Sequence, residues 1–233
     1  MKNYYTYGYG KKLKEKKIDF MEPAENFLRV YKMNFQKKKN LNCLDFGVGD
    51  GRHTKFLLKK SNNVLATDIS TEAIKLSKKN IPNFKNYLIL PKNNYSKLIE
   101  NKQKFDLIIC WETAHWIGDL NKIIDLLNIF TLKLKRKKHI IITFPTEDHY
   151  LIKNKKVGKF LYKIKEPERK DALICAPRLK NLKKMFNKNK LQIQQIFKYS
   201  HSRVFFDNNY NDLSSTNLKN KMFSMYAFLL QKK

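Results

Sequence analysis

Hydrophobic and polar positions alternate along this chain in two different periods, and these periods predict strands and helices in turn. Short apolar runs of the kind that form buried strands occupy residues 41–46, 63–68, 86–90, 105–111 and 138–144. Apolar residues at helical spacing occupy 22–35, 52–60, 71–80 and 120–134. A further helix is predicted from 178 to 189, followed by two strands at 191–199 and 222–230.

This order of strands and helices predicts one α/β domain over residues 1–233. We expect a doubly wound, Rossmann-like sheet of about seven strands, mostly parallel, with helices on both faces. Residues 151–180 are lysine-rich and irregular, and we predict a helical insert there, close to the substrate mouth. Residues 1–36 are predicted as an N-terminal helical lid segment. Its stretch 4–9 is rich in tyrosine and forms either an aromatic lid over the cofactor or a simply packed terminus.

A glycine-rich loop follows the first predicted strand, in the stretch LDFGVGDGRHT at residues 44–54. A strand that ends in a glycine turn and opens a helix lets the backbone approach a ligand closely. The dinucleotide fingerprint GxGxxG requires glycine at position 52, which is arginine here. The spacing is instead D-x-G-x-G-x-G, and the aspartate at its start, Asp45, favours a cationic or zwitterionic ligand over a pyrophosphate.

A second carboxylate, Asp68, ends the next predicted strand. At this place a carboxylate can accept hydrogen bonds from both hydroxyl groups of a ribose. Asp45, the glycine loop and Asp68 together describe a site for a nucleoside that carries an ammonium group and no pyrophosphate. S-adenosylmethionine has this structure, whereas three glycines alone are also compatible with an ordinary tight turn.

Several motifs resemble those of the class I S-adenosylmethionine-dependent methyltransferases, among them the small-molecule enzymes. The matching stretches are LDFGVGDGRHT, ATDIS at 66–70, FDLIICWETAHWIGDLNKIIDLL, KKHIIITFP and MYAFLLQKK, the last resembling a final antiparallel strand. The resemblance implies S-adenosyl-L-methionine as cofactor. It also implies cofactor-binding roles for Asp45, Phe46, Gly47, Gly49, Gly51, Asp68, Ile69, Trp111 and, at the adenine, Asn93 or Asn94. The chain departs from the pattern at residues 136–138, where Arg-Lys-Lys replaces the usual glycine pair.

The methyl acceptor is expected at the carboxyl ends of the fourth and fifth strands, where ligands lie in such sheets. His115 is a candidate general base for an acceptor hydroxyl or, equally, a packing residue. Glu112 is an alternative base or a solvated loop residue, and the tryptophans nearby, Trp111 and Trp116, belong to the core or cover the cofactor. The polar stretch 146–150 offers substrate contacts or a solvated loop, and no metal-ligand spacing appears.

The charge of the chain raises the question of a nucleic-acid partner. The formal net charge is +29 over 233 residues, and nearly all of the excess is lysine, not the arginine that recognises phosphates and bases bidentately. A/T-rich codon usage also explains such a lysine content. The fourth-strand loop, CWETAHWI, has neither the Asn/Asp-Pro-Pro-aromatic turn nor the nucleophilic cysteine of base methyltransferases. Lysines between 153 and 184 border the predicted mouth and suggest a phosphate- or nucleotide-bearing acceptor, including an activated sugar.

The sequence therefore predicts a methyltransferase that methylates a small molecule, with oxygen as the expected acceptor atom. An RNA methyltransferase acting on tRNA or rRNA and a non-catalytic S-adenosylmethionine-binding protein are the alternatives. Three cysteines without CxxC spacing, the absence of a secretory h-region and the lack of a long apolar run predict a cytoplasmic protein with no membrane span. The oligomeric state stays open.

Overall fold

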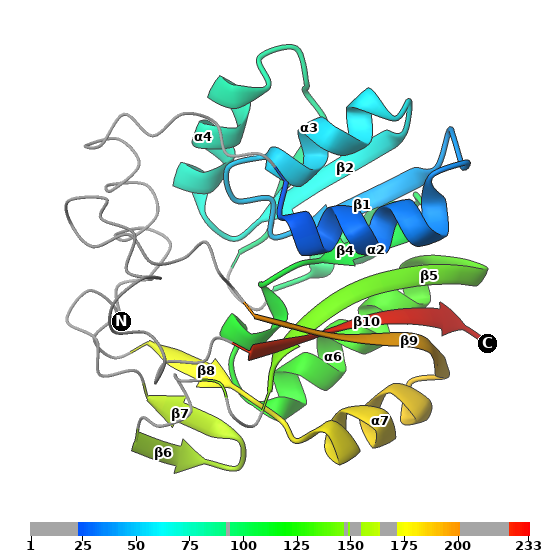
Figure 1. Cartoon of the computed structure of the whole chain (residues 1–233). Coiled ribbons are helices and arrows are strands. Elements are labelled where there is room, and N and C mark those ends of the chain that lie inside the picture. Colours follow the sequence, from blue (N-terminus) through cyan, green and yellow to red (C-terminus); the bar gives the residue numbers. More distant parts are fainter. Residues whose placement is uncertain (1–22, 92–93, 147–148, 150–154, 164–171, 201–223) are drawn as a thin grey trace, which may run out of the picture.

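Seven strands form one sheet at the centre of the molecule. The computed structural model describes residues 23–91, 94–146, 149, 155–163, 172–200 and 224–233 (Figure 1). Strands β1 (Asn42–Phe46), β2 (Asn63–Asp68), β3 (Tyr87–Ile89), β4 (Phe105–Cys110) and β5 (Leu134–Pro145) are parallel neighbours. The sheet order is β3-β2-β1-β4-β5-β10-β9. Strand order reverses between β1 and β4, so the edge at the carboxyl ends of these two strands is where a ligand is expected.

The last two strands complete the sheet beyond β5. Strand β10 (Ser224–Lys232) lies between β5 and β9 (Leu191–Ser200) and is antiparallel to both. The predicted fold class, a mostly parallel seven-stranded sheet with an antiparallel last strand, is thus confirmed. The antiparallel strand lies inside the sheet, and β9 forms its edge.

Helices cover both faces of the sheet, as predicted. On one face lie α2 (Glu25–Phe35), α3 (Arg52–Lys59) and α4 (Thr71–Asn80), packed against strand residues that alternate along the chain with those of the opposite face. On the other face lie α5 (Ser96–Glu100), α6 (Leu120–Lys133) and α7 (Leu179–Lys188). The helix α4 begins after its N-cap residue Ser70, whose hydroxyl accepts the backbone N–H of Ala73 at 3.2 Å.

The N-terminal segment divides into a packed helix and a part outside the described residues. Helix α2 buries Phe27, Val30, Tyr31 and Phe35 against the sheet and forms part of the core. Residues 1–22, including the tyrosine-rich stretch 4–9, lie outside the described residues. The lid role therefore stays a prediction for that part of the chain.

The predicted helical insert is corrected by the structure. The described residues of 151–180 before helix α7 form a second, three-stranded sheet of β6 (Lys155–Gly158), β7 (Leu161–Lys163) and β8 (Leu173–Cys175). Its strands are antiparallel and too short to show a clear alternation, and the lysines obscured the pattern further. Ile174 of β8 packs against Trp116, so this small sheet lies beside the loop that follows β4.

Candidate functional site

The glycine loop of residues 47–51 joins β1 to α3 in a backbone form that glycine favours. Gly47, Gly49 and Gly51 all have positive φ, at 85°, 54° and 89°. A Cβ on Gly47 would lie 2.2 Å from the Thr113 Oγ1, and one on Gly51 would lie 2.4 Å from the Ser77 Oγ. A Cβ on Gly49 would meet no atom within 4 Å. Two of the glycines thus allow close packing inside the protein, and Gly49 borders open space where a ligand can approach.

The predicted ribose-binding carboxylate contacts this loop directly. Asp68, at the end of β2, accepts the backbone N–H of Gly49 at 3.0 Å with one oxygen and that of Ser70 at 2.9 Å with the other. Burial raises the pKa of this carboxyl, and the backbone donors lower it. Each carboxylate oxygen can accept a second hydrogen bond, so Asp68 retains capacity for hydroxyl donors. The structure therefore brings the loop and Asp68 together as predicted.

Asp45 is fixed by a contact inside the protein. Its Oδ2 accepts the Thr54 hydroxyl at 2.6 Å, which ties β1 to α3, and the residue is 2% exposed. Burial, with the nearby carboxylates of Asp68 and Asp50, raises its pKa to about 6 even though the Thr54 hydroxyl lowers it. Negative charge is thus concentrated here, and a cationic ligand is favoured electrostatically.

The aspartate between the last two glycines is a site residue that the sequence reasoning passed over. Asp50 is 4% exposed, and its Oδ1 accepts the backbone N–H of Arg52 at 3.1 Å. Its Oδ2 has no hydrogen-bond partner within the described part of the chain. The sequence signal for Asp50 was its place inside the glycine loop. Its burial adds a structural one, because a buried carboxylate without a full set of hydrogen-bond donors is costly in the absence of a ligand.

The aromatic residues predicted to contact the cofactor lie in the core. The Phe46 ring packs 5.1 Å from the Phe130 ring on the α6 face. The Trp111 ring lies on the opposite face, stacked on Tyr199 at 5.3 Å and edge-on to Phe27 at 5.6 Å. Both residues are 4% exposed, and their contact with a cofactor stays a prediction. Ile69 is half-buried against the α6 face.

The two asparagines predicted at the adenine have different outcomes. Asn93 lies outside the described residues. Asn94 is exposed, its Oδ1 accepts the backbone N–H of Ser96 at 2.9 Å, and its own N–H donates to Pro91 at 2.9 Å. Asn94 thus shapes the turn before α5, and its amide N–H groups are the part that can meet a ligand.

The loop after β4 carries the candidate base. His115 lies in the short 3₁₀ helix η2 (Ala114–Trp116), is 4% exposed, and has its ring 5.0 Å from the Trp116 ring. η2 contacts both β5 and β8. This burial favours the packing role that the sequence left open, and the catalytic role of His115 stays a prediction.

The alternative base, Glu112, adopts a backbone form that is uncommon for a residue with a side chain. Its φ is 53°, its N–H donates to the Thr143 hydroxyl at 2.7 Å, and its Oε1 accepts the Tyr199 hydroxyl at 3.3 Å. Tyr199 is a second residue that sequence reasoning missed as part of this edge, because it lies in a strand far along the chain. Burial and the Glu112 carboxylate raise the pKa of Tyr199 well above its ordinary value, so the phenol stays protonated as a donor.

The remaining polar candidates follow β5. Thr146 and His149 are both buried, and the backbone N–H of His149 donates to the Thr146 carbonyl at 3.2 Å. Glu147, Asp148 and Tyr150 lie outside the described residues. Among the residues that the structure describes, no group of three His, Cys, Asp or Glu side chains is arranged to hold a metal ion.

The three cysteines, Cys43, Cys110 and Cys175, are buried and unpaired. Burial raises the pKa of Cys43, Cys110 and Cys175, to about 12 for Cys175, so all three remain neutral thiols. Cys110 is therefore a packing residue at the end of β4 and not a nucleophile.

Comparison with known proteins agrees with this geometry. Residues 44–128 match a family model described as "Methyltransferase domain", and this range contains the glycine loop, Asp68 and η2. No curated protein matches the sequence significantly.

Solved structures share the fold at low sequence identity. A S-adenosylmethionine-dependent methyltransferase from Methanosarcina mazei superposes with a TM-score of 0.66 at 13% identity, covering 91% of this chain and 99% of that one. The N-methyltransferase NodS from Bradyrhizobium japonicum, solved with S-adenosyl-L-homocysteine, gives 0.61 at 10% identity, with 97% and 98% covered. The 1,6-didemethyltoxoflavin-N1-methyltransferase from Burkholderia thailandensis gives 0.61 at 12%, with 98% and 84% covered. These likenesses concern the fold alone.

Proposed function

We propose that this class I S-adenosylmethionine-dependent methyltransferase transfers the cofactor's methyl group to a small-molecule acceptor, at an oxygen atom. The observation that carries the proposal is the hydrogen bond between Gly49 and Asp68. It sets a ribose-accepting carboxylate against the one glycine of the loop that borders open space.

The residues present fit the cofactor. Asp68 would hold the ribose hydroxyls, Gly49 would let the backbone approach, and the carboxylates of Asp45 and Asp50 would attract the positive charge. The bound cofactor supplies an electrophilic methyl group on a sulfonium. Catalysis by the chain is then mostly positioning, because an in-line approach of the acceptor needs little further chemistry.

The acceptor side combines η2 with the small sheet. His115 would accept the proton of an acceptor hydroxyl, and the 3₁₀ helix that carries it is held between β5 and β8. Lys156 and Lys163 of the small sheet are cations that could contact a phosphate-bearing acceptor, such as a nucleotide or activated sugar. The buried neutral thiols suit the reducing cytoplasm in which we place the reaction.

RNA is the second candidate acceptor, because the net charge of +29 favours a polyanion. The described loops at the carboxyl ends of the parallel strands, here called the carboxyl edge, argue against an RNA acceptor. Residues 45–52, 68–72 and 111–119 carry the acids Asp45, Asp50, Asp68, Glu72, Glu112 and Asp119, with Arg52 as their only lysine or arginine. An RNA chain would run along these acids, whereas a small acceptor needs only a local contact beside η2.

The test uses S-adenosylmethionine labelled in its methyl group, incubated with the purified protein and a lysate of its source cells. We expect label in the low-mass fraction. Asp68→Ala should weaken cofactor binding by about 10- to 100-fold, the cost of losing charged hydrogen bonds. Asp125→Ala, which removes an exposed carboxylate on α6, is the matched control and should bind normally.

Two outcomes contradict the proposal and are separable. Nuclease-sensitive label in the polymer fraction would identify the protein as an RNA methyltransferase. Normal cofactor binding without label in any fraction, from several growth conditions, would identify a non-catalytic binding protein.

A further inference from the structure

One edge of the sheet, opposite the site, carries a dense cluster of lysines. This edge is formed by the amino ends of the parallel strands and the carboxyl ends of the helices before them. We call it the basic edge and define it by residues 36–41, 59–62, 99–106, 131–139, 187–191 and 231–233. Its basic residues are Lys37, Lys38, Lys39, Lys59, Lys60, Lys102, Lys104, Lys133, Lys135, Arg136, Lys137, Lys138, Lys188, Lys190, Lys232 and Lys233. Its acids are Glu100 and Asp106.

Hydrogen bonds show that these segments meet in space. The Lys104 Nζ donates to the Leu132 carbonyl at 2.8 Å, and the Lys232 Nζ donates to the Leu134 carbonyl at 2.9 Å. The backbone N–H of Lys233 donates to the Lys190 carbonyl at 3.1 Å. The loops after α2 and α3 are joined by Asn40 N–H and Ser61 C=O at 3.2 Å.

The cations repel one another across these loops. Burial first, and then Lys104 and Lys190, lower the pKa of Lys232. Burial, Lys38 and Lys138 likewise lower the pKa of His139. Asp106, paired with Lys135 at 3.0 Å and Lys138 at 3.2 Å, neutralises only part of this charge. An anionic partner would relieve the repulsion.

Codon usage and helix electrostatics explain only part of the cluster. Codon usage adds lysine everywhere, yet the described loops at the carboxyl edge are acidic. Helix carboxyl ends favour cations, which accounts for Lys59 and Lys188. Residues 102–104, 135–138 and 232–233 lie outside helices, so their charge has another cause.

Two aliphatic side chains stand exposed inside the basic edge. Ile99, in the last turn of α5, is 47% exposed, and Leu132, in the last turn of α6, is 52% exposed. The two helix ends are joined by Lys133, which is only 3% exposed and whose Nζ donates to the Ile99 carbonyl at 2.7 Å. The exposed Lys104 binds the Leu132 carbonyl. Exposed aliphatic side chains beside lysines suit the headgroup region of a bilayer, which accommodates both apolar and cationic groups.

We propose that the basic edge is a docking surface for an anionic lipid bilayer. Lysines around Ile99 and Leu132 hold the protein on the bilayer reversibly. Nucleic acid fits the same charge less well. Every aromatic side chain whose burial the structure describes is buried or half-buried, so no exposed ring offers a stacking platform for bases. The surface also has lysine where bidentate phosphate recognition uses arginine, with Arg136 as its single exception.

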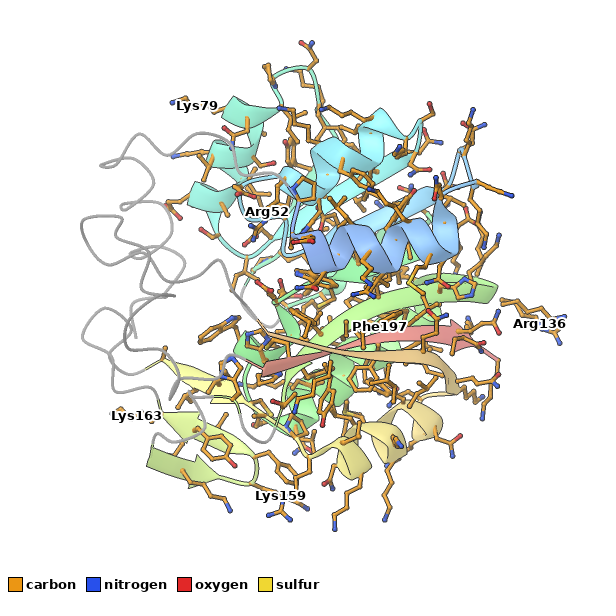
Figure 2. The ribbon with its side chains drawn as sticks, in the orientation of Figure 1. Arg52, Lys79, Arg136, Lys159, Lys163 and Phe197 are labelled. Atoms are coloured by element: carbon orange, nitrogen blue, oxygen red, sulfur yellow. The ribbon has the colours of Figure 1, made fainter. Side chains whose placement is uncertain are left out.

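This orientation leaves the catalytic edge facing away from the lipid. Figure 2 shows Arg136 at the far right of the molecule, well separated from Arg52 at the start of α3 and from Lys79 on α4. Among the described residues no helix is long and apolar enough to cross a membrane.

Vesicle co-sedimentation of the full chain tests the proposal. The probes are phosphatidylcholine vesicles with and without one-third phosphatidylserine, at low and high salt. The variant Lys37→Gln/Lys39→Gln/Lys102→Gln/Arg136→Gln removes four exposed cations. We expect binding to the anionic vesicles to fall by several hundredfold, since each lysine at such a surface contributes roughly fivefold. The control Lys75→Gln/Lys79→Gln/Lys156→Gln/Lys180→Gln removes the same charge elsewhere and should bind nearly as the wild type does.

A second pair of variants tests the apolar part. Ile99→Ser/Leu132→Ser should weaken binding at high salt, where lysine attraction is screened, whereas Val157→Ser/Ile196→Ser should not. Equal binding to neutral and anionic vesicles, or equal loss in both lysine variants, overturns the proposal. So does tighter, salt-dependent retention of bulk RNA that the basic-edge variant alone abolishes, which assigns the surface to nucleic acid.

Discussion

The variants Gly49→Ala and Gly47→Ala should distinguish an effect on cofactor binding from an effect on stability within the same loop. Both residues have positive φ, so a side chain at either costs about 1–2 kcal/mol. At Gly49 the new methyl group meets nothing within 4 Å, and this backbone cost is the whole penalty. At Gly47 the methyl group also overlaps Thr113, and displacing that side chain adds about 1–3 kcal/mol.

These energies convert into melting temperatures. For a chain of this length, 1 kcal/mol corresponds to roughly 2–4 °C. Gly49→Ala should therefore lower the melting temperature by about 2–8 °C, and Gly47→Ala by about 4–20 °C. Cofactor binding should show a different order, because only the Gly49 methyl group enters the open space. At a temperature where both variants are folded, Gly49→Ala should bind S-adenosylmethionine at least tenfold more weakly than the wild type does.

Thermal denaturation and calorimetric titration measure the two effects independently. Thr113→Gly combined with Gly47→Ala should recover part of the lost stability, since it removes the side chain that the new methyl group strikes. The reasoning fails if Gly49→Ala binds the cofactor as tightly as the wild type. In that case the open space beside Gly49 is not where the cofactor lies.

The remaining predictions concern three buried titratable residues. Asp45→Asn keeps an acceptor for the Thr54 hydroxyl but cannot ionise. Because the pKa of Asp45 is raised from 3.8 to about 6, the wild type loses up to about 3 kcal/mol as the pH rises through pH 4–6, and urea midpoints of the variant should not show this loss. The pH dependence that His53 contributes has the opposite sign. Burial lowers the pKa of His53 from 6.5 to about 3, so the wild type loses stability as the pH falls below 6.5. His53→Leu should remove that part of the decline. His115→Gln should lower kcat by about 10²- to 10⁴-fold with unchanged cofactor affinity if the acceptor is a hydroxyl, and unchanged kcat would leave His115 a packing residue.

Local sequence signals were sufficient for most of the main sheet and for one half of the site. The continuous apolar runs of β4 and β5 and the Ser70 cap of α4 are readable because burial and capping impose them residue by residue. The link between Gly49 and Asp68 was also predictable, since parallel neighbours end at the same edge. Lys137 lies in the stretch 136–138, where the resemblance suggested a glycine pair, and it takes a φ of 56°, in the region that glycine favours.

Features that depend on distant partners could not be read in the same way. The small sheet of β6–β8 consists of strands of three or four residues whose pairing has no local signature. The Tyr199 hydroxyl donates to Glu112 over a sequence separation of 87 residues, and no sequence motif indicates that hydrogen bond. The Asp45 carboxylate accepts a hydrogen bond from Thr54, and only the packing of α3 on β1 reveals that contact.

The position of β10 inside the sheet has a consequence for how the chain folds during synthesis. β5 and β9 both pair with β10 and not with each other. Until residues 224–232 have left the ribosome, β5 therefore has one open side and β9 has no partner strand in the described sheet. The parallel half, from β3 to β5, can assemble earlier, and the partly made chain then exposes an open apolar edge that invites association with other chains. A premature stop anywhere before β10 should therefore yield an aggregating product, and chaperone capture of nascent chains should peak in the interval between the completion of β5 and the arrival of β10.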